Sequence, residues 1–207
     1  LDKTGTLTDG RMKVNDCMLL NNPTEYSVNE IVGNCLYALQ DNNQTSIALY
    51  NYFGHNTSLH ATATLPFSSK RKLSAATFEE IGTVAIGAPE FVLGTIPTKI
   101  NKIINQYASM GLRVLVVAHA PASITGDAPP AGLKPIAIVS IADNIREDAA
   151  QTIRWFKEND VAIRIISGDN PRTVSEVAKR VGGANAEKYI SLEGLSDSEV
   201  ASVANKY

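Results

Sequence analysis

The chain has 207 residues, of which 44% are hydrophobic and 19% charged, and its formal net charge at pH 7 is -2. The length allows one large domain or two modest ones, and the weak net charge without a Lys/Arg run argues against nucleic-acid binding. No stretch approaches the roughly 18 to 20 apolar residues of a membrane helix. We therefore expect a soluble chain. Cys17 and Cys35 have no metal-ligand or redox spacing, which indicates a reducing compartment. It starts at Leu1 and opens directly on a dense motif, which suggests a piece of a longer protein.

In the first half of the chain, the Thr-rich segment LDKTGTLTDG predicts a functional loop that would follow a strand. A capping box at Ser27 and Glu30 predicts a helix over about 28–40, and a second helical pattern covers about 45–53. Strand patterns follow at about 61–65, 73–78 and 83–86. The last two are joined by a short turn ending at Gly82, which indicates an antiparallel hairpin.

In the second half, apolar residues from Ile100 to Tyr107 predict an amphipathic helix that Gly111 closes, followed by a strand over about 112–118. Residues 119–132 read as an exposed loop near a domain boundary. Strand, helix, strand and helix then alternate over about 136–142, 146–158, 161–167 and 171–181, as in an open parallel sheet. Ser196 and Glu199 form a capping box for a final short helix.

The most specific signal is the run Asp2 to Thr8, DKTGTLT, which resembles the phosphorylation motif of P-type ATPases at all seven positions. The resemblance implies that Asp2 attacks the γ-phosphoryl group of ATP and becomes an aspartyl-phosphate. Mg²⁺, held at Asp2 and Thr4, would neutralise the developing charge. Lys3 would offset anionic charge, and Gly5 would let the backbone approach the phosphoryl oxygens.

Thr4 separates two reaction classes. Haloacid-dehalogenase-like phosphatases, which share this fold, usually carry a second Asp two residues after the nucleophile as general acid and base. Threonine cannot shuttle that proton, so an aspartyl-phosphate at Asp2 should persist. This favours a transport cycle over a soluble phosphatase.

A second signal, Ser167-Gly168-Asp169, follows an apolar strand and precedes a helix, where open parallel sheets place ligands. It resembles the family's threonine-glycine-aspartate motif. The Ser167 hydroxyl would then bind a phosphoryl oxygen beside the donors of the helix N-terminus. By itself, a Ser-Gly-Asp loop is equally typical of an ordinary turn.

Asp143 and Arg146 match two positions of the family's aspartate-proline-proline-arginine motif, without its two prolines. The resemblance implies that they lie near the nucleotide ribose and the domain hinge.

A third set resembles the nucleotide-binding domain of the pumps that include the calcium and sodium/potassium ATPases. Phe67 would stack on adenine, Lys72 would contact the base, and Gly87-Ala88 would allow close approach. Arg113 matches the arginine that reaches the ATP phosphates. Without the resemblance, Phe67 could equally be a core residue and the Lys70 to Lys72 run a solvated face.

Two positions depart from that family pattern. Ile86 stands where a lysine is usual, and Ser46 aligns with a usual glutamate. Loss of both charges should weaken ATP binding or loosen base selectivity. His55, His60 and His119 match no ligand pattern, and we expect them in loops or on the surface.

Together these features predict an α/β chain in two domains. An incomplete haloacid-dehalogenase-like parallel sheet, residues 1–14 and 134–207, would be interrupted by an α+β nucleotide-binding domain, residues 15–133, that contains an antiparallel sheet. The implied function is the ATP-binding and phosphorylation segment of a P-type cation pump, on the cytoplasmic face of the membrane. The alternatives are a soluble phosphatase and a nucleotide-sensing module without turnover.

The implied cofactors are ATP and Mg²⁺, and the implied partners are the transported cation and a membrane domain. The family's Mg²⁺ motif GDGVND does not occur in the 207 residues. We therefore expect this chain to be inactive by itself. We also expect it to be monomeric. The identity of the ion cannot be read from this sequence, because its ligands would lie in membrane helices.

Overall fold

The computed structural model describes residues 1–203 and 206, and it divides into two compact units. Unit 1 consists of Leu1–Arg11, Asn105–Arg113 and Asp143–Tyr207. Unit 2 consists of Met12–Ile104 and Val114–Ala142. Within the described residues, no helix combines the length and apolar character that crossing a bilayer requires.

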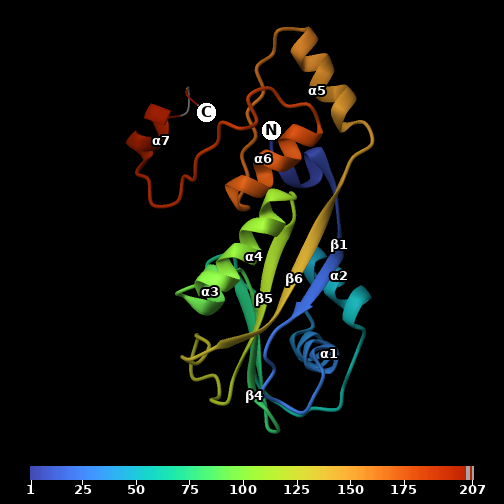
Figure 1. Cartoon of the computed structure of the whole chain (residues 1–207), viewed down its shortest axis with the longest axis vertical. Coiled ribbons are helices and arrows are strands. Elements are labelled where there is room, and N and C mark those ends of the chain that lie inside the picture. The colour runs from blue at the N-terminus through green and yellow to red at the C-terminus, as the bar shows by residue number, and fades with distance from the viewer. Residues whose placement is uncertain (204–205, 207) are drawn as a thin grey trace. The chain divides into compact units, whose positions relative to one another are not determined.

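Figure 1 shows the helices and strands, coloured along the chain from blue to red and labelled where there is room. The strands are β1 (Thr8–Leu19), β2 (Ala61–Leu65), β3 (Leu73–Phe78), β4 (Gly82–Gly87), β5 (Arg113–Ala120) and β6 (Lys134–Ile145). The helices are α1 (Val28–Leu39), α2 (Gln44–Phe53), α3 (Pro89–Leu93), α4 (Thr98–Ser109), α5 (Ala149–Glu158), α6 (Pro171–Arg180) and α7 (Asp197–Val203). A turn over Lys3–Leu7, in which the backbone of Thr4 and Gly5 is not helical, precedes β1.

The six strands form one sheet in the order β1-β6-β5-β4-β3-β2. In unit 2, β2, β3, β4 and β5 pair antiparallel with their neighbours. The hairpin of β3 and β4 pairs Leu73 with Gly87 at its open end and Phe78 with Gly82 beside its turn. The expected antiparallel hairpin is therefore confirmed.

The core of unit 2 lies between the sheet and the helices α1 and α2 (Figure 1). Ile31 and Cys35 of α1 are fully buried against Ala76 of β3 and Val84 of β4. Side chains alternate between the faces of a strand, so the buried neighbours Thr83 and Ala85 of β4 point to the opposite face.

The start of α1 confirms the expected capping box. The Ser27 hydroxyl accepts from the Glu30 amide at 3.2 Å, and the Ser27 amide donates to the Glu30 carboxylate at 2.8 Å. The second helix begins after Asn43, whose side chain accepts from the Ser46 amide at 3.0 Å. Both helices thus begin where their sequences supply a cap for free backbone amides.

Unit 1 has a smaller core. It consists of Leu7 from the first loop, Ala149 and Ile153 from α5, and Val181 after α6. The strand expected over 161–167 forms only a single parallel bridge, between Ile166 and Asp2. The Ile166 amide donates to the Leu1 carbonyl at 2.8 Å beside this bridge. Val161 and Ile166 are exposed, whereas the apolar side chains of a central parallel strand are buried on both faces.

Two further elements differ from expectation. The strand predicted at 136–142 belongs to β6, which lies between β1 and β5 rather than beside residues 161–167. The long strand β1 was not predicted, because Asp9 and Gly10 read as turn residues. Its signal is the alternation of Met12 and Val14 with the polar residues Arg11, Lys13 and Asn15, and both apolar side chains pack in the core of unit 2.

Candidate functional site

The loop that carries Asp2 is a tight, braced turn. Gly5 has φ +79°, a left-handed conformation that favours glycine. The Thr8 hydroxyl accepts from the Gly5 amide at 3.3 Å and donates to the Lys3 carbonyl at 3.4 Å. Leu7 is buried, whereas Asp2 and Thr4 are exposed. The turn therefore presents the Asp2 carboxylate to solvent from a fixed backbone.

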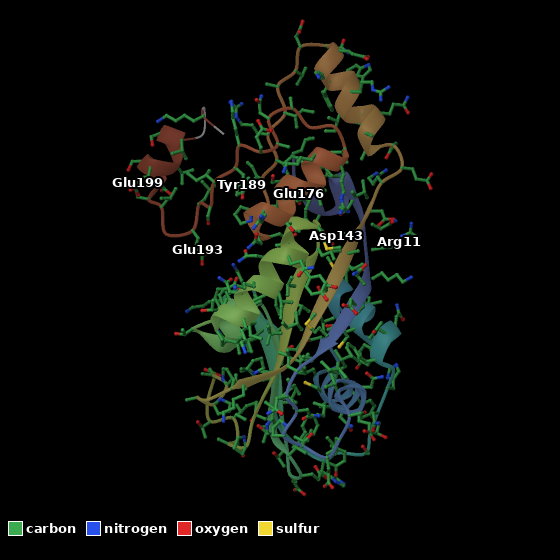
Figure 2. The ribbon with its side chains drawn as sticks, viewed as in Figure 1. Arg11, Asp143, Glu176, Tyr189, Glu193 and Glu199 are labelled. Carbon is green, nitrogen blue, oxygen red and sulfur yellow. The ribbon has the colours of Figure 1, made fainter. Side chains whose placement is uncertain are left out.

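Lys3, in contrast, is turned inward and is fully buried. Its ammonium forms ion pairs with two carboxylates, those of Asp143 and Asp169, and the second pair has an N–O distance of 2.6 Å. Asp143 belongs to the last part of β6 (Figure 2). The charge of Lys3 is thus neutralised by protein groups within unit 1.

Asp169 links Lys3 to Arg113. The Arg113 guanidinium donates to the other Asp169 oxygen at 2.5 Å, and its side chain is 26% exposed. Burial would by itself raise the pKa of Asp169, but the charges of Arg113 and Lys3 outweigh burial and hold it below the usual 3.8. Asp169 is therefore ionised at neutral pH and holds two cations together.

The Ser167-Gly168-Asp169 segment leads into α6, and the Ser167 hydroxyl accepts from the Asp169 amide at 3.2 Å. A Cβ at Gly168 would meet no atom within 4 Å, and the backbone there is not left-handed. Neither packing nor conformation requires glycine at this place. Open space beside an exposed turn suits the close approach of a ligand.

The helix after this segment is capped by Asn170, whose side chain accepts from the Arg172 amide at 3.0 Å, and Pro171 occupies its first turn. The structure therefore gathers Lys3, Asp143, Asp169 and Arg113 in one ionic cluster. Asp2, Thr4 and the 167–169 segment belong to the same unit.

Arg146 is not part of this cluster. Its guanidinium bonds to Asp148 at 3.2 Å, two residues along the chain, and it is largely exposed. Asp143, although predicted beside it at a ribose, uses its carboxylate for Lys3. Arg146 therefore remains available to solvent while Asp143 does not.

Three of the predicted nucleotide residues in unit 2 lie together at the open end of the β3–β4 hairpin. The Ala88 amide donates to the Lys72 carbonyl at 3.0 Å, directly after Gly87. A Cβ at Gly87 would lie 2.5 Å from that same carbonyl. The pairing of the hairpin thus requires glycine at 87, whatever a ligand needs.

Phe67 lies in the loop before β3 and is 48% exposed. The alternative that it is a core residue is therefore wrong. Ile86 and Ser46, at the two positions that depart from the family pattern, are both buried, and Ile86 packs in the core against α1 and α2. Neither contributes a charge to a binding surface.

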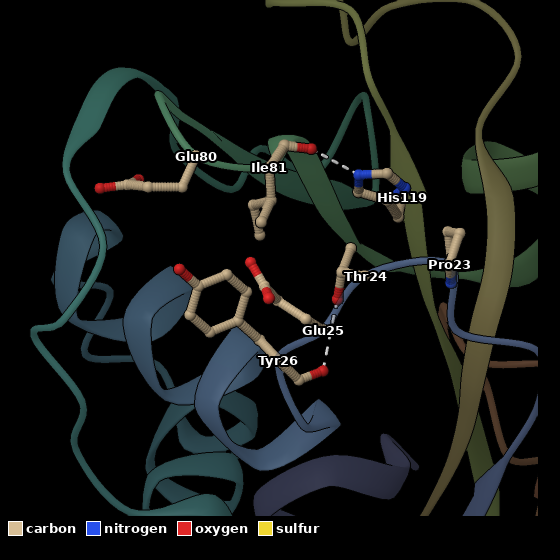
Figure 3. A pocket seen from close by; sticks show the side chains of 7 residues that line it. All are labelled: Pro23, Thr24, Glu25, Tyr26, Glu80, Ile81 and His119. Atoms are coloured by element: carbon tan, nitrogen blue, oxygen red, sulfur yellow. Dashed lines mark hydrogen bonds between the residues drawn. The ribbon is translucent and has the colours of Figure 1, made fainter.

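A separate pocket of about 400 Å³ lies elsewhere in unit 2 (Figure 3). Its lining consists of Pro23, Thr24, Glu25, Tyr26, Glu80, Ile81 and His119. Two carboxylates make it unfavourable for phosphates, and it contains none of the predicted nucleotide residues. His119, expected in a loop or on the surface, is buried in β5 and bonds the Ile81 carbonyl at 2.5 Å.

The donors for Mg²⁺ are sparse. Among residues 1–203 and 206, no group of three or more His, Cys, Asp or Glu side chains could hold a metal. Mg²⁺ is commonly bound by one or two carboxylates together with phosphates and water. The exposed Asp2 carboxylate, beside Thr4, fits that mode of binding and not a cage built from protein alone.

Residues 1–203 match the family model of the haloacid dehalogenase-like hydrolases, and the chain belongs to this family. The expected resemblance to cation-transporting P-type ATPases is confirmed by its relatives. A probable cation-transporting ATPase, exp7, from Streptococcus pneumoniae serotype 4 is 34% identical over the whole chain, which covers 26% of that protein. The calcium-transporting ATPase CtpE of Mycolicibacterium smegmatis is 32% identical over 87% of the chain and is covered over 22% of its own length.

Among solved structures, the crystal structure of a zinc-transporting PIB-type ATPase matches 88% of the chain with a TM-score of 0.53 and 22% identity. The match covers 27% of that ATPase and shows a shared fold. The chain therefore spans about a quarter of the length of the relatives it resembles.

Proposed function

We propose that the chain is the ATP-binding and phosphorylation segment of an ATP-driven cation pump, with Asp2 as the phosphoryl acceptor. The observation that carries this is the contrast between the exposed Asp2 carboxylate and its buried neighbour Lys3, which Asp143 and Asp169 hold inward. A fixed loop with one free carboxylate is what a nucleophile requires.

In the proposed step, an Asp2 carboxylate oxygen forms a bond to the γ-phosphorus while the bond from that phosphorus to the β–γ bridging oxygen breaks, and ADP leaves. Mg²⁺, held by Asp2 and Thr4, would offset the negative charge on the phosphoryl oxygens. The Ser167 hydroxyl and the backbone beside Gly168 would bind those oxygens. The ionic cluster positions both loops and takes no part in bond making.

For the nucleotide itself, we propose that Phe67 stacks on the base while Lys72, Gly87 and Ala88 line the base end. The exposed face of Phe67 supports this role. Arg113 and Arg146 would contact phosphates or ribose. Arg113 would do so while its guanidinium is also ion-paired with Asp169. Residues 15–133 would be the nucleotide-binding domain, and residues 1–14 and 134–207 the phosphorylation domain.

Rapid hydrolysis, as in a soluble phosphatase, would require a proton donor and acceptor near Asp2. Thr4 cannot serve, and the Lys3 ammonium already binds the carboxylates of Asp143 and Asp169. An aspartyl-phosphate at Asp2 would therefore be long-lived. This property suits a cycle in which phosphorylation biases two conformations of a membrane domain.

The relatives named above are cation-transporting ATPases, which supports a cation as the transported species and the cytoplasmic side of a membrane as the location. In this proposal the membrane domain and the ion ligands belong to the longer protein.

The nucleotide half is tested by titrating the 207-residue chain with ATP and ADP while backbone amide shifts are followed. Saturable shifts near Phe67, Lys72 and Gly87 should disappear in Phe67→Ala. Tyr52→Ala is the matched control, because Tyr52 is also 48% exposed but lies on α2. Equal loss of these shifts in both variants, or no shifts at several millimolar nucleotide, would contradict the proposed nucleotide site.

The phosphorylation half is tested in the longer pump polypeptide with γ-labelled ATP. Label should be acid-stable, released by hydroxylamine as an acyl phosphate is, and absent from Asp2→Asn. Thr4→Asp should accelerate loss of label by restoring a general acid and base. Label that persists in Asp2→Asn would place the acceptor elsewhere.

A further inference from the structure

Lys72 has an unusual and tightly held backbone. Its φ is +50°, in the left-handed region that long side chains seldom adopt. The Lys72 amide donates to the Ser68 carbonyl at 2.8 Å, and its carbonyl accepts from Ala88 at 3.0 Å. Conformations of this kind persist where the surrounding structure determines them and are common at ligand sites. The base of the Lys72 side chain is therefore fixed.

The far end of the same side chain is also held. The Lys72 ammonium lies over the ring of Phe91, 5.0 Å from its centroid. Phe91 lies on α3, and its amide donates to the Ala88 carbonyl at 3.0 Å. The helix therefore starts at Ala88, the residue whose amide bonds to the Lys72 carbonyl. Val92, the next residue, is buried and anchors this short helix.

A cation over an aromatic face within about 6 Å is attracted by the negative face of the ring. Lysine has several rotatable bonds, and ordering them on binding costs free energy. Contact with Phe91 orders the ammonium before a ligand arrives, which is the physical basis of preorganisation. Ile86 stands where the family usually has a lysine, and it is buried and uncharged. The placement of the Lys72 ammonium therefore matters more for binding at this end of the hairpin.

We propose that Phe91 is a positioning residue, which holds the Lys72 ammonium at the base end of the nucleotide site. This rests on the proposed nucleotide-binding function. Phe91 does not touch the nucleotide and acts through Lys72. The aromatic face, and not the apolar volume, is the property that matters.

The first measurement requires no nucleotide. In the 207-residue chain, ring current from Phe91 should shift the ε-CH₂ protons of Lys72 upfield. The shift should be lost in Phe91→Leu, which keeps apolar volume, and retained in Phe91→Tyr, which keeps the ring face. Retained hydrogen-exchange protection of the Gly94 amide, which donates to the Glu90 carbonyl at 3.1 Å, would show that α3 is intact. Identical Lys72 shifts in both variants would overturn the contact, and with it the proposal.

The second measurement is a double-mutant cycle on ATP affinity with Phe91→Leu and Lys72→Met. Phe91→Leu should weaken binding about two- to fivefold in the parent chain and leave it unchanged in the Lys72→Met background. Equal weakening in both backgrounds would show a merely structural effect and would refute positioning. Absence of ATP binding in the parent chain would refute the nucleotide site, and the proposal with it, while the ring-current shift would still decide separately whether the contact exists.

Discussion

The ammonium of Lys3 lies 2.6 Å from Oδ2 of Asp169, 166 positions further along the chain. This pair joins the loop that presents Asp2 to the loop that opens α6. Since Lys3 is fully buried, the pair is shielded from water and salt. The relation between the two loops therefore depends on a buried charge network.

Removal of the Asp169 charge should destabilise the chain strongly. Asp169→Asn leaves Lys3 and Arg113 with one carboxylate fewer, and we expect a loss of about 3 kcal/mol in unfolding free energy, because the buried Lys3 ammonium loses one of its two carboxylate partners. The check is urea unfolding. Asp148→Asn is the control, since that carboxylate is 62% exposed and its loss should cost under about 0.5 kcal/mol. Similar losses for both would contradict the network.

Acid should remove the same stabilisation. The pKa of Asp169 is lowered in the folded chain relative to 3.8, so its contribution is complete above that value and is lost as pH falls through the folded pKa. The difference in unfolding free energy between the parent and Asp169→Asn should be constant above about pH 5 and shrink below about pH 4. A difference that is independent of pH down to the acid transition would refute the role of this carboxylate.

Substitution by alanine should destabilise the chain at Gly87 and leave its stability almost unchanged at Gly168. At Gly87 an added Cβ would lie 2.5 Å from the Lys72 carbonyl, and we expect a loss of about 1–3 kcal/mol in thermal or urea unfolding. At Gly168 the added Cβ has no neighbour within 4 Å, so stability should change by less than about 0.5 kcal/mol. Phosphorylation of Asp2 in the longer protein should nevertheless fall in Gly168→Ala. A tolerant Gly87 would mean that the hairpin can open at this end.

Both cysteines should be slow to react. Burial raises the pKa of Cys35 to about 12, and burial with the nearby Asp16 raises that of Cys17 to about 11. Since the thiolate is the reactive form, alkylation at pH 8 should be slow in the folded chain and fast in urea. Mass spectrometry after iodoacetamide treatment checks this. Rapid labelling of Cys35 before unfolding would show that the core beneath α1 opens.

Local patterns predicted most of unit 2, because its helices and strands carry their own signals. The Ser27–Glu30 box and the alternation in β3 and β4 act over a few residues, and the structure confirms them. β1 was missed because Asp9 and Gly10 resemble a turn. The residues over 161–167 have the composition of a strand but pair at a single bridge, to Asp2. Whether a segment forms a strand depends on distant residues that pair with it, and local composition does not reveal them.

In the candidate site, the motif predicted which residues matter and left their partners open. The sequence singled out Lys3, Asp143, Asp169 and Arg113 separately, and for Lys3 the resemblance implied a role in offsetting anionic charge. Burial and ion pairing decide its orientation, and both depend on residues about 140 or more positions away. Phe91 belongs to no recognised motif, and its contact with Lys72, a residue with a left-handed backbone, joins positions 19 residues apart.

The β3–β4 hairpin also bears on the order in which the chain acquires structure. Its strands are separated by three residues, so pairing them closes a very short loop, and the entropy lost on closure is small. β6 reaches its place beside β1 only after more than a hundred intervening residues have been gathered. The hairpin therefore costs little chain entropy to close, whereas the β1–β6 pairing requires the closure of a much longer loop, so the end of the sheet that carries Lys72 and Gly87 depends on local contacts more than the β1–β6 edge does.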